Sequence, residues 1–246
     1  MDAGAKYIAY PSINTPLAFF NQCKVEIGKE LTIVEKEPGM GITSVLAGNF
    51  IKPVHISIGS GITEFSIVFK PIGINCLYSE NIGKLLGNGL MEVNNFDFLK
   101  GTVAKILSGE FAFEELEELI LEHFECTIEL EKLEQIIKLL CMSEVISFQE
   151  ISDRLRIPYK AIYRSFIRHL GISPIQFKKI RRFSMAIKKG VNPAYESRMS
   201  SIALESGYFD QAHYINEFKK MTKLTPRSFK LGVWTDENRR IVWKLE

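Results

Sequence analysis

The sequence has few of the residues that build disulfide frameworks and metal sites. Among its 246 residues are only 4 cysteines and 4 histidines. The cysteines show no CxxC pair and no regular spacing, which is typical of reduced, mostly buried thiols in a cytoplasmic protein. They are Cys23, Cys76, Cys126 and Cys141. Only one histidine, His55, falls within residues 1–110, so we expect no metal site and no cofactor there, and we interpret His55 as a half-buried strand residue.

Long hydrophobic runs are also absent. No stretch approaches the ~18 consecutive apolar residues of a membrane-spanning helix, and the start of the chain lacks the basic-then-apolar order of a signal peptide. We therefore expect no membrane partner and a cytoplasmic location. The composition, 46% hydrophobic and 24% charged, is typical of a globular protein that can bury a core.

Charge is divided unevenly along the chain. Residues 143–246 hold 20 lysines and arginines against 10 aspartates and glutamates, whereas residues 1–142 hold 11 against 19. A basic half of this kind indicates a polyanion such as double-stranded DNA as its partner, although a solvated basic surface would give the same count.

The order of the expected elements predicts an α+β fold. Up to about residue 105 the sequence shows short β-rich runs separated by glycine and proline, which favours an antiparallel barrel or sandwich. The runs are Tyr7–Tyr10, Leu31–Val34, Ile42–Leu46, His55–Ile58 and Phe65–Phe69. From Phe111 to Leu140 the apolar residues take helical spacing, with nine glutamates between Glu114 and Glu134. We interpret this segment as an acidic helical hairpin that packs on the barrel, with a dimerisation surface as the alternative.

After Cys141 the sequence is helical to about Gly232. The hydrophobic period and the sign of the charge both change near residue 143. We therefore predict a sensor or dimerisation domain at 1–142, β-rich over 1–105 and helical over 111–142, followed by an all-α domain at 143–246.

The basic half contains an internal repeat. Its members recur at an offset of 52 residues, so that Phe166, Pro174, Phe177 and Lys178 return as Phe218, Pro226, Phe229 and Lys230. Each copy has the order helix, turn, helix, proline, helix, which contains a helix-turn-helix unit. The duplication therefore predicts two DNA-recognition helices in one domain.

Capping signals mark where these helices begin. Ser147 and Glu150 have the spacing of a capping box, and Asp210 is a good N-cap for the second recognition helix. Pro158 opens the first recognition helix after a turn at Arg156-Ile157. Each unit then closes with a capped helix that begins at proline, at Ser173-Pro174 and at Thr225-Pro226.

The buried stripe of each recognition helix determines which side chains face outward. The first helix buries Ile162 and Phe166, and the second buries Tyr214 and Phe218. The residues that we predict to face DNA are Lys160, Tyr163 and Arg164 in the first helix and Gln211, Ala212, Ile215, Asn216 and Lys219 in the second. The neighbouring His213 is interpreted as structural or phosphate-directed.

The segment Ile175–Lys189 reads as one helix that links the two units. Its ~15 residues span roughly 22 Å, so with the turns added the recognition helices could reach successive major grooves about 34 Å apart. It carries the basic residues Lys178 and Arg182, which we include among the predicted DNA contacts.

From about Ser147 to Lys230 the sequence closely resembles the AraC/XylS family of transcription regulators. The family pattern I-A…G-F-x-d-x-S-x-F…F-K…G-x-S-P…Y/F is met by Ile202-Ala203, Gly207 to Tyr214, Phe218-Lys219, Thr225-Pro226 and Phe229. The sequence departs from the family at Arg156 and Lys223, where glycine is usual, and at Pro158-Tyr159, which replaces Ser-Pro. The resemblance implies a regulator that acts with RNA polymerase and is not an enzyme. Arg164 is the strongest candidate for a base contact, as a bidentate donor to guanine.

The N-terminal half resembles the small cupin-like sensor domain of such regulators. The segment Phe65–Gly73 is similar to their F-x-P-x-G strand end. This resemblance implies a small-molecule effector, a homodimer, or both.

Three other readings remain possible for the chain. A cupin enzyme would need two or three histidines and a glutamate that converge on a metal. An alkyl-transfer DNA-repair protein would need activated or zinc-bound cysteines in clustered spacing, which Cys23 and Cys76 do not show. A purely architectural DNA binder would not need a separate acidic half.

Overall fold

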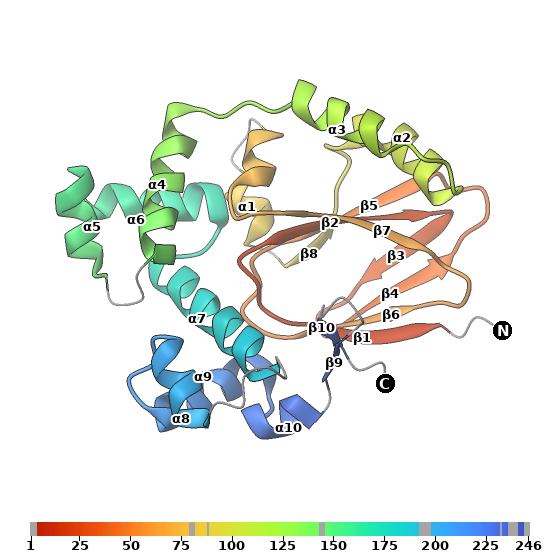
Figure 1. The fold of residues 1–246 in the computed structure, drawn as a ribbon. Helices are drawn as coiled ribbons and strands as arrows, with labels where there is room; N and C mark the ends of the chain where they lie inside the picture. The colour runs from red at the N-terminus through yellow and green to blue at the C-terminus, as the bar shows by residue number, and fades with distance from the viewer. Residues whose placement is uncertain are drawn as a thin grey trace.

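The computed structural model of the chain describes residues 4–78, 82–87, 89–142, 146–191, 198–231, 233–235 and 241–243. Two β-sheets form the N-terminal part, and helices cover one of the sheets and make up the C-terminal part (Figure 1). The predicted α+β fold is therefore confirmed.

Each sheet has four strands. One sheet has the order β1-β6-β4-β3 and the other β7-β2-β5-β8, and every pairing is antiparallel except that of β4 with β6. The strands are β1 (Ala5–Ala9), β2 (Thr15–Asn21), β3 (Cys23–Ile27), β4 (Leu31–Lys36), β5 (Ile42–Ala47), β6 (Val54–Ile58), β7 (Glu64–Phe69) and β8 (Leu90–Glu92). The five predicted strands correspond to β1, β4, β5, β6 and β7.

Strand β2 is central in its sheet and is buried on both faces. Leu17 and Phe19 belong to a core under the helices, whereas Ala18 and Phe20 belong to the core between the two sheets. A strand covered on both faces shows a continuous apolar run rather than alternation, and for this reason the sequence pattern did not reveal it.

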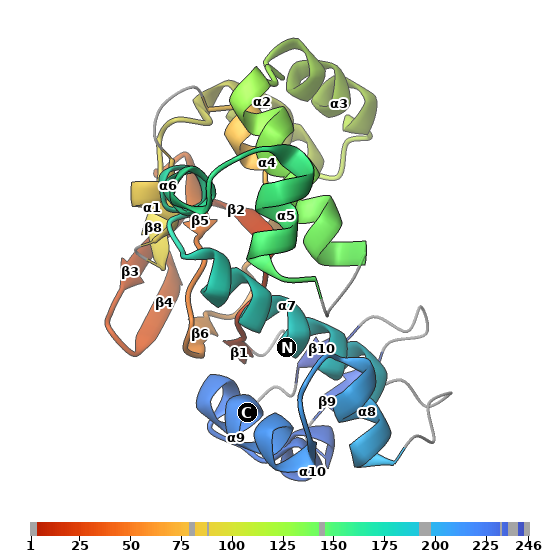
Figure 2. The same ribbon diagram turned by 90° about the vertical axis from the view of Figure 1, so that its left-hand side faces the viewer.

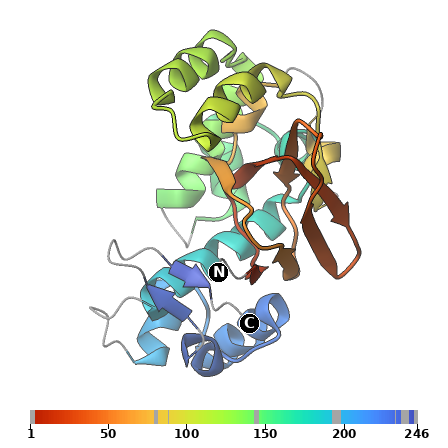
Figure 3. The ribbon, with the colours of Figure 1, turned by 90° about the vertical axis from the view of Figure 1, so that its right-hand side faces the viewer.

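Two α-helices fall within the region that was predicted to hold only strands and turns, and the prediction was wrong for those segments. They are α1 (Gly83–Leu86) and α2 (Asp97–Leu107), preceded by the short 3-10 helix η1 (Gly73–Cys76). Helix α2 packs beside α3 (Phe113–Glu122) over the sheet that contains β2 (Figures 1 and 3). Their buried residues, Leu99, Val103 and Leu116, complete the core under the helices.

The predicted acidic hairpin divides between two cores. Helix α3 packs on the sheet as expected, but α4 (Ile128–Met142) does not. Leu133, Ile136, Ile137 and Leu140 on α4 join the core of the C-terminal helices. The prediction of two helices was therefore right, but the prediction that α4 packs on the barrel was wrong. Helical spacing shows which face of a helix is buried, but it does not show which element covers that face. Residue 143, where we placed the domain boundary, lies outside the described residues.

The C-terminal part is helical, as predicted. Its helices are α5 (Phe148–Leu155), α6 (Tyr159–Leu170), α7 (Pro174–Val191), α8 (Met199–Glu205), α9 (Gln211–Thr222) and α10 (Pro226–Leu231). Helix α7 runs from the first helix-turn-helix unit to the second (Figures 1 and 2). Beyond Gly232, itself outside the described residues, the strands β9 (Val233–Thr235) and β10 (Ile241–Trp243) pair in an antiparallel manner. The prediction of an all-α domain over 143–246 was therefore wrong for these two segments, which consist mostly of the β-branched and aromatic residues that favour strands.

The repeat in the sequence is a repeat in the packing. Phe166 meets Phe177 edge to face with ring centroids 5.5 Å apart, and Phe218 meets Phe229 in the same way at 5.1 Å. Each pair joins a recognition helix to the helix that begins at the following proline. The 52-residue offset therefore marks the same structural joint in both units.

At the two positions where this sequence has another residue in place of the usual glycine, the backbone is in the left-handed conformation. Arg156 ends α5 with φ +53° and Lys223 ends α9 with φ +64°. A side chain with a Cβ is strained in this region, which explains why glycine is preferred there. Arg156 nevertheless makes the turn that the sequence predicts.

Candidate nucleic-acid interface and ligand cavities

The side chains of α6 that were predicted to face DNA are exposed to solvent. Lys160, Tyr163 and Arg164 are exposed, whereas Ile162 and Phe166 on the opposite stripe are fully buried. The supporting helix α5 begins with the predicted capping box, in which the Glu150 amide donates to Ser147 Oγ over 3.1 Å. The first residue of α6 has no side-chain cap, as expected from Pro158.

Helix α9 repeats this arrangement with a less charged face. Gln211, Ala212, Asn216 and Lys219 are exposed and Ile215 is half-buried. The helix begins at the predicted N-cap, where Asp210 Oδ1 accepts from the amide of His213 over 2.7 Å. The His213 ring in turn accepts from the Phe209 amide over 3.3 Å, which agrees with a structural role.

Two of the predicted DNA contacts instead bind protein carbonyl groups. Lys178 Nζ donates to Ile146 O over 2.8 Å, and burial together with Arg182 lowers the pKa of Lys178. Arg182 donates to Gly207 O over 3.3 Å and lies over the Tyr208 ring. One side chain thus holds the start of the first unit and the other holds the turn of the second, and these positions give no support to direct DNA contact.

The C-terminal end of α6 is held by two side-chain amides from the N-terminal part. Asn49 Nδ2 donates to Leu170 O over 2.6 Å, and Asn75 Nδ2 donates to His169 O over 2.7 Å. Both asparagines are 5% exposed. The last carbonyl groups of a helix have no partner within it, so these amides supply bonds that α6 cannot make itself. Sequence reasoning missed them because a single asparagine carries no local signal of a partner far away in the chain.

Glycines allow α1 and α6 to approach at the same place. A Cβ on Gly83 would lie 2.2 Å from Arg168 O, and a Cβ on Gly171 would lie 2.3 Å from Gly83 O. Gly171 ends α6 with φ +69°. We call this contact the α1–α6 interface. Beside it, Glu129 on α4 forms an ion pair with Arg168 over 3.2 Å.

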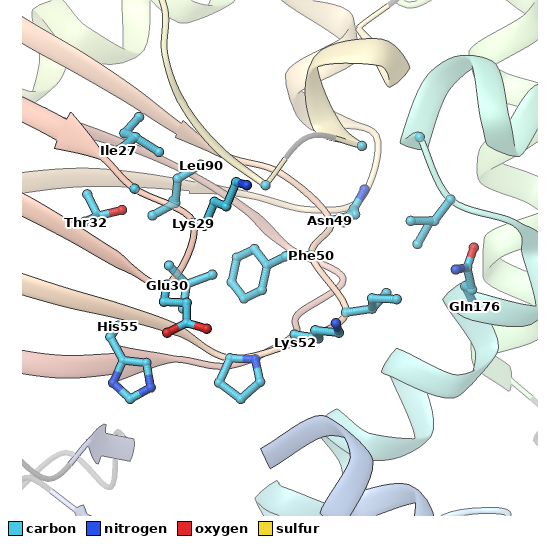
Figure 4. Close-up of a pocket in the computed structure, with 18 of the residues that line it drawn as sticks. Ile27, Lys29, Glu30, Thr32, Asn49, Phe50, Lys52, His55, Leu90 and Gln176 are labelled. Carbon is cyan, nitrogen blue, oxygen red and sulfur yellow. The ribbon is translucent and has the colours of Figure 1, made fainter. Parts of the chain in front are cut away.

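A cavity of about 830 Å³ opens between the N-terminal part and the helix-turn-helix units (Figure 4). We call it the interface cavity. Lys29 and Glu30 reach it from the β3–β4 turn, Phe50 and Lys52 from the β5–β6 connection, and Gln176 from α7. It is also lined by Gly171 and Lys223, the residues that end the two recognition helices α6 and α9. His55 lies here as well and is exposed on β6, so its interpretation as a half-buried strand residue was wrong.

A second cavity of about 380 Å³ lies between the two sheets, and we call it the inter-sheet cavity. Its lining is mostly apolar and includes Phe20, Val34, Val45 and Ile56. Thr32, Phe50 and Leu90 line both cavities, so the two spaces adjoin. The Thr32 hydroxyl is buried and has no hydrogen-bond partner among the described residues. Such an orphaned hydroxyl is a ready partner for a polar atom of a ligand.

Two observations on the described residues bear on the enzyme alternatives. Within the described residues, no three histidines, cysteines, aspartates or glutamates come close enough to hold a metal ion. Burial raises the pKa of Cys23 and also that of Cys76, whereas nucleophilic thiols need a lowered pKa. The prediction of mostly buried cysteines was half right, because Cys126 and Cys141 are exposed. In the described part of the chain no helix is both long and apolar enough to cross a membrane.

Comparisons with known proteins agree with this geometry. The profile of a helix-turn-helix domain family matches residues 151–231. Among solved structures, ToxT from Vibrio cholerae is similar with a TM-score of 0.51 at 15% identity, covering 94% of this chain and 95% of that one. ToxT from Vibrio cholerae O395 bound to (E)-4-(8-methylnaphthalen-1-yl)but-3-enoic acid is similar with a TM-score of 0.50 at 15% identity, covering 94% and 96%. At this identity the likeness is one of fold over nearly the whole chain. A comparison with curated proteins gave no match.

Proposed function

Because residues 151–231 form a helix-turn-helix domain of the AraC type, we propose that the chain is a sequence-specific, DNA-binding transcription regulator. The observation that carries the proposal is the pair of outward faces on a duplicated unit, one on α6 and one on α9. Helix α6 supplies Lys160, Tyr163 and Arg164, and we propose that it reads base edges in one major groove. Helix α9 has no arginine on its outer face, and we propose that it binds the next groove with less stringent selection.

The effector and partners are further parts of the proposal. A regulator of this kind acts through RNA polymerase at the promoter, in the cytoplasm, and a homodimer through the N-terminal part would double the DNA contacts. We keep 1–142 as the sensor domain and 143–246 as the DNA-binding domain. The packing of α4 with the C-terminal core makes that helix the physical link between them.

Selection of duplexes from a random library by the purified full chain tests DNA recognition. We expect one motif to be enriched, with two half-sites about one helical turn apart and stronger base preference in one half. Specific sites bind typically 10³–10⁷ times more tightly than random DNA at physiological salt. Equal affinity for selected and random duplexes would rule out the proposed regulator.

We further propose that the effector is an amphiphilic carboxylic acid. Its carboxylate would lie in the interface cavity, where Lys29, Lys52 and Lys223 supply positive charge, and its apolar part would pass Phe50 into the inter-sheet cavity. The ligand of the similar ToxT structure, an aryl-butenoic acid, has this combination of groups. A charged group needs an opposite charge when it leaves water, whereas the apolar part gains by burial.

This position would couple the ligand to DNA binding. The interface cavity touches the ends of both recognition helices through Gly171 and Lys223, and touches the sheets through Lys29. A ligand that bridges Lys29 and Lys223 stabilises the arrangement in which sheets and helices are joined. The ligand can change DNA affinity only as far as it binds the joined arrangement of sheets and helices more tightly than the separated one.

Titration of the full chain with the aryl-butenoic acid tests the effector site. We expect saturable binding that Lys223→Met weakens about 10-fold to 100-fold, because a hydrogen bond to a charged group contributes about 1.5–3 kcal/mol. The primary amide of the same compound should bind to the unchanged protein about as weakly as the acid binds to Lys223→Met. Lys24→Met is the matched control, since Lys24 pairs with Glu26 on β3 and does not line the cavity. Equal affinity for acid and amide would contradict the carboxylate assignment.

A further inference from the structure

Two cysteines that are far apart in the sequence lie side by side in the fold. Cys76 ends η1, and Cys126 lies in the connection between α3 and α4. The amide of Glu125 donates to Cys76 O over 2.7 Å, so the two backbones are in direct contact beside the thiols. The neighbouring Cys126 contributes to the raised pKa of Cys76, which agrees with a close approach of the two side chains. This arrangement brings the two sulfur atoms within reach of one another.

The members of this pair differ in access to solvent. Cys76 is 3% exposed, whereas Cys126 is exposed. Cys23 and Cys141 have no such thiol neighbour within the described residues, although Cys141 is also exposed. The pair therefore combines one thiol that reagents can reach with one that only its neighbour can reach.

We infer that Cys76 and Cys126 form a redox modification site that closes to an intramolecular disulfide when the protein meets a low-molecular-weight disulfide. In the first step the thiolate of Cys126 attacks the small disulfide RSSR, forms a mixed disulfide with one RS group, and releases the other as RS⁻. In the second step Cys76 gives its proton to water, attacks the Cys126 sulfur and expels the remaining RS⁻. The two electrons of the thiol pair thus pass to RSSR, which becomes two RSH.

Burial makes the second step slow. Burial is the largest cause of the raised pKa of Cys76 and Glu134 acts in the same direction, so the nucleophilic thiolate forms rarely at neutral pH. The thiolate is the species that attacks a disulfide, and its fraction rises with pH. The mixed disulfide on Cys126 should therefore accumulate first and convert faster at higher pH.

The site lies next to the bond that holds the first recognition helix. Asn75, which donates to His169 O at the end of α6, directly precedes Cys76. The chain from Cys126 leads into α4, where Glu129 pairs with Arg168. A disulfide between Cys76 and Cys126 joins these two supports of α6 covalently, and so it restrains the end of that helix.

Incubation of the full chain with oxidised glutathione, followed by peptide mapping under non-reducing conditions, tests the inference. We expect a Cys76–Cys126 cross-linked peptide and a rise in Tm of about 5–10 °C, since closing a loop of this length restricts the unfolded chain. Amide hydrogen exchange in the last turn of α6 should become slower in the oxidised protein.

Serine variants supply the controls. Cys126→Ser should abolish both the cross-link and the Tm shift, whereas Cys141→Ser should leave both unchanged, because Cys141 is exposed but unpaired with another described thiol. Stable glutathione adducts on Cys126 and Cys141 alike, without a cross-link at neutral or raised pH, would overturn the inference. None of these readouts uses DNA, so they are independent of the proposed regulatory function.

Discussion

Replacing Gly171 with alanine is expected to destabilise the full chain by about 2–4 kcal/mol. The new Cβ would lie 2.3 Å from Gly83 O and 2.6 Å from Gly87 N, both of which are backbone atoms that cannot turn aside. The residue would also be forced to keep φ +69°. The left-handed conformation costs about 1–2 kcal/mol for a residue with a Cβ, and overpacking costs about 1–3 kcal/mol. Denaturant unfolding at equilibrium measures the loss.

Gly101→Ala is the matched control for this prediction. Gly101 lies inside α2, and a Cβ there would meet nothing within 4 Å. Alanine in an exposed helix interior is favoured over glycine by roughly 0.5–1 kcal/mol, so this variant should be more stable than the unchanged protein. If both variants had the same stability, the close approach of α1 to α6 would not be a real constraint.

Arg164→Ala is expected to lower affinity for the selected duplex about 5-fold to 150-fold. A bidentate contact to guanine contributes about 1–3 kcal/mol of discrimination, and Arg164 is exposed on the outer face of α6 with no protein partner for its charge among the described contacts. Equilibrium binding at several salt concentrations measures the loss. The slope of log affinity against log salt should change by no more than about one unit.

Two comparisons distinguish a base contact from a phosphate contact. On random duplexes Arg164→Ala should lose far less affinity than on the selected site. Arg154→Ala removes the same charge from the exposed side of the supporting helix α5 and should affect both duplexes alike. An equal loss on both duplexes for Arg164→Ala would identify Arg164 as a phosphate contact and leave base reading to Lys160 and Tyr163.

The C-terminal part was predictable because its signals are local. Ser147, Asp210 and the residues before the paired prolines, Ser173 and Thr225, mark helix starts through bonds that span three residues. The buried stripes of α6 and α9 follow from helical spacing alone, and the repeat offset marks the same joint twice. The exposed residues on both recognition helices were therefore identified from the sequence.

The same reasoning did not identify the protein partner where one charge or one apolar face had two possible partners. Lys178 and Arg182 have the composition of DNA contacts, yet in the fold they lie beside Ile146 O and Gly207 O. Helix α4 has an apolar stripe that fits either core, and it packs with the C-terminal helices. Spacing defines which residues share a face but does not define what covers that face.

The sequence by itself determined the helix-turn-helix units, their caps and their outward faces, since each depends on bonds and spacings within a single turn or helix. Only the tertiary structure decided how the two halves meet. The amides of Asn49 and Asn75 at the end of α6 and the contact of Gly83 with Gly171 each join segments far apart in the chain. Contacts of this kind depend on the path of the whole backbone, and no local pattern records it.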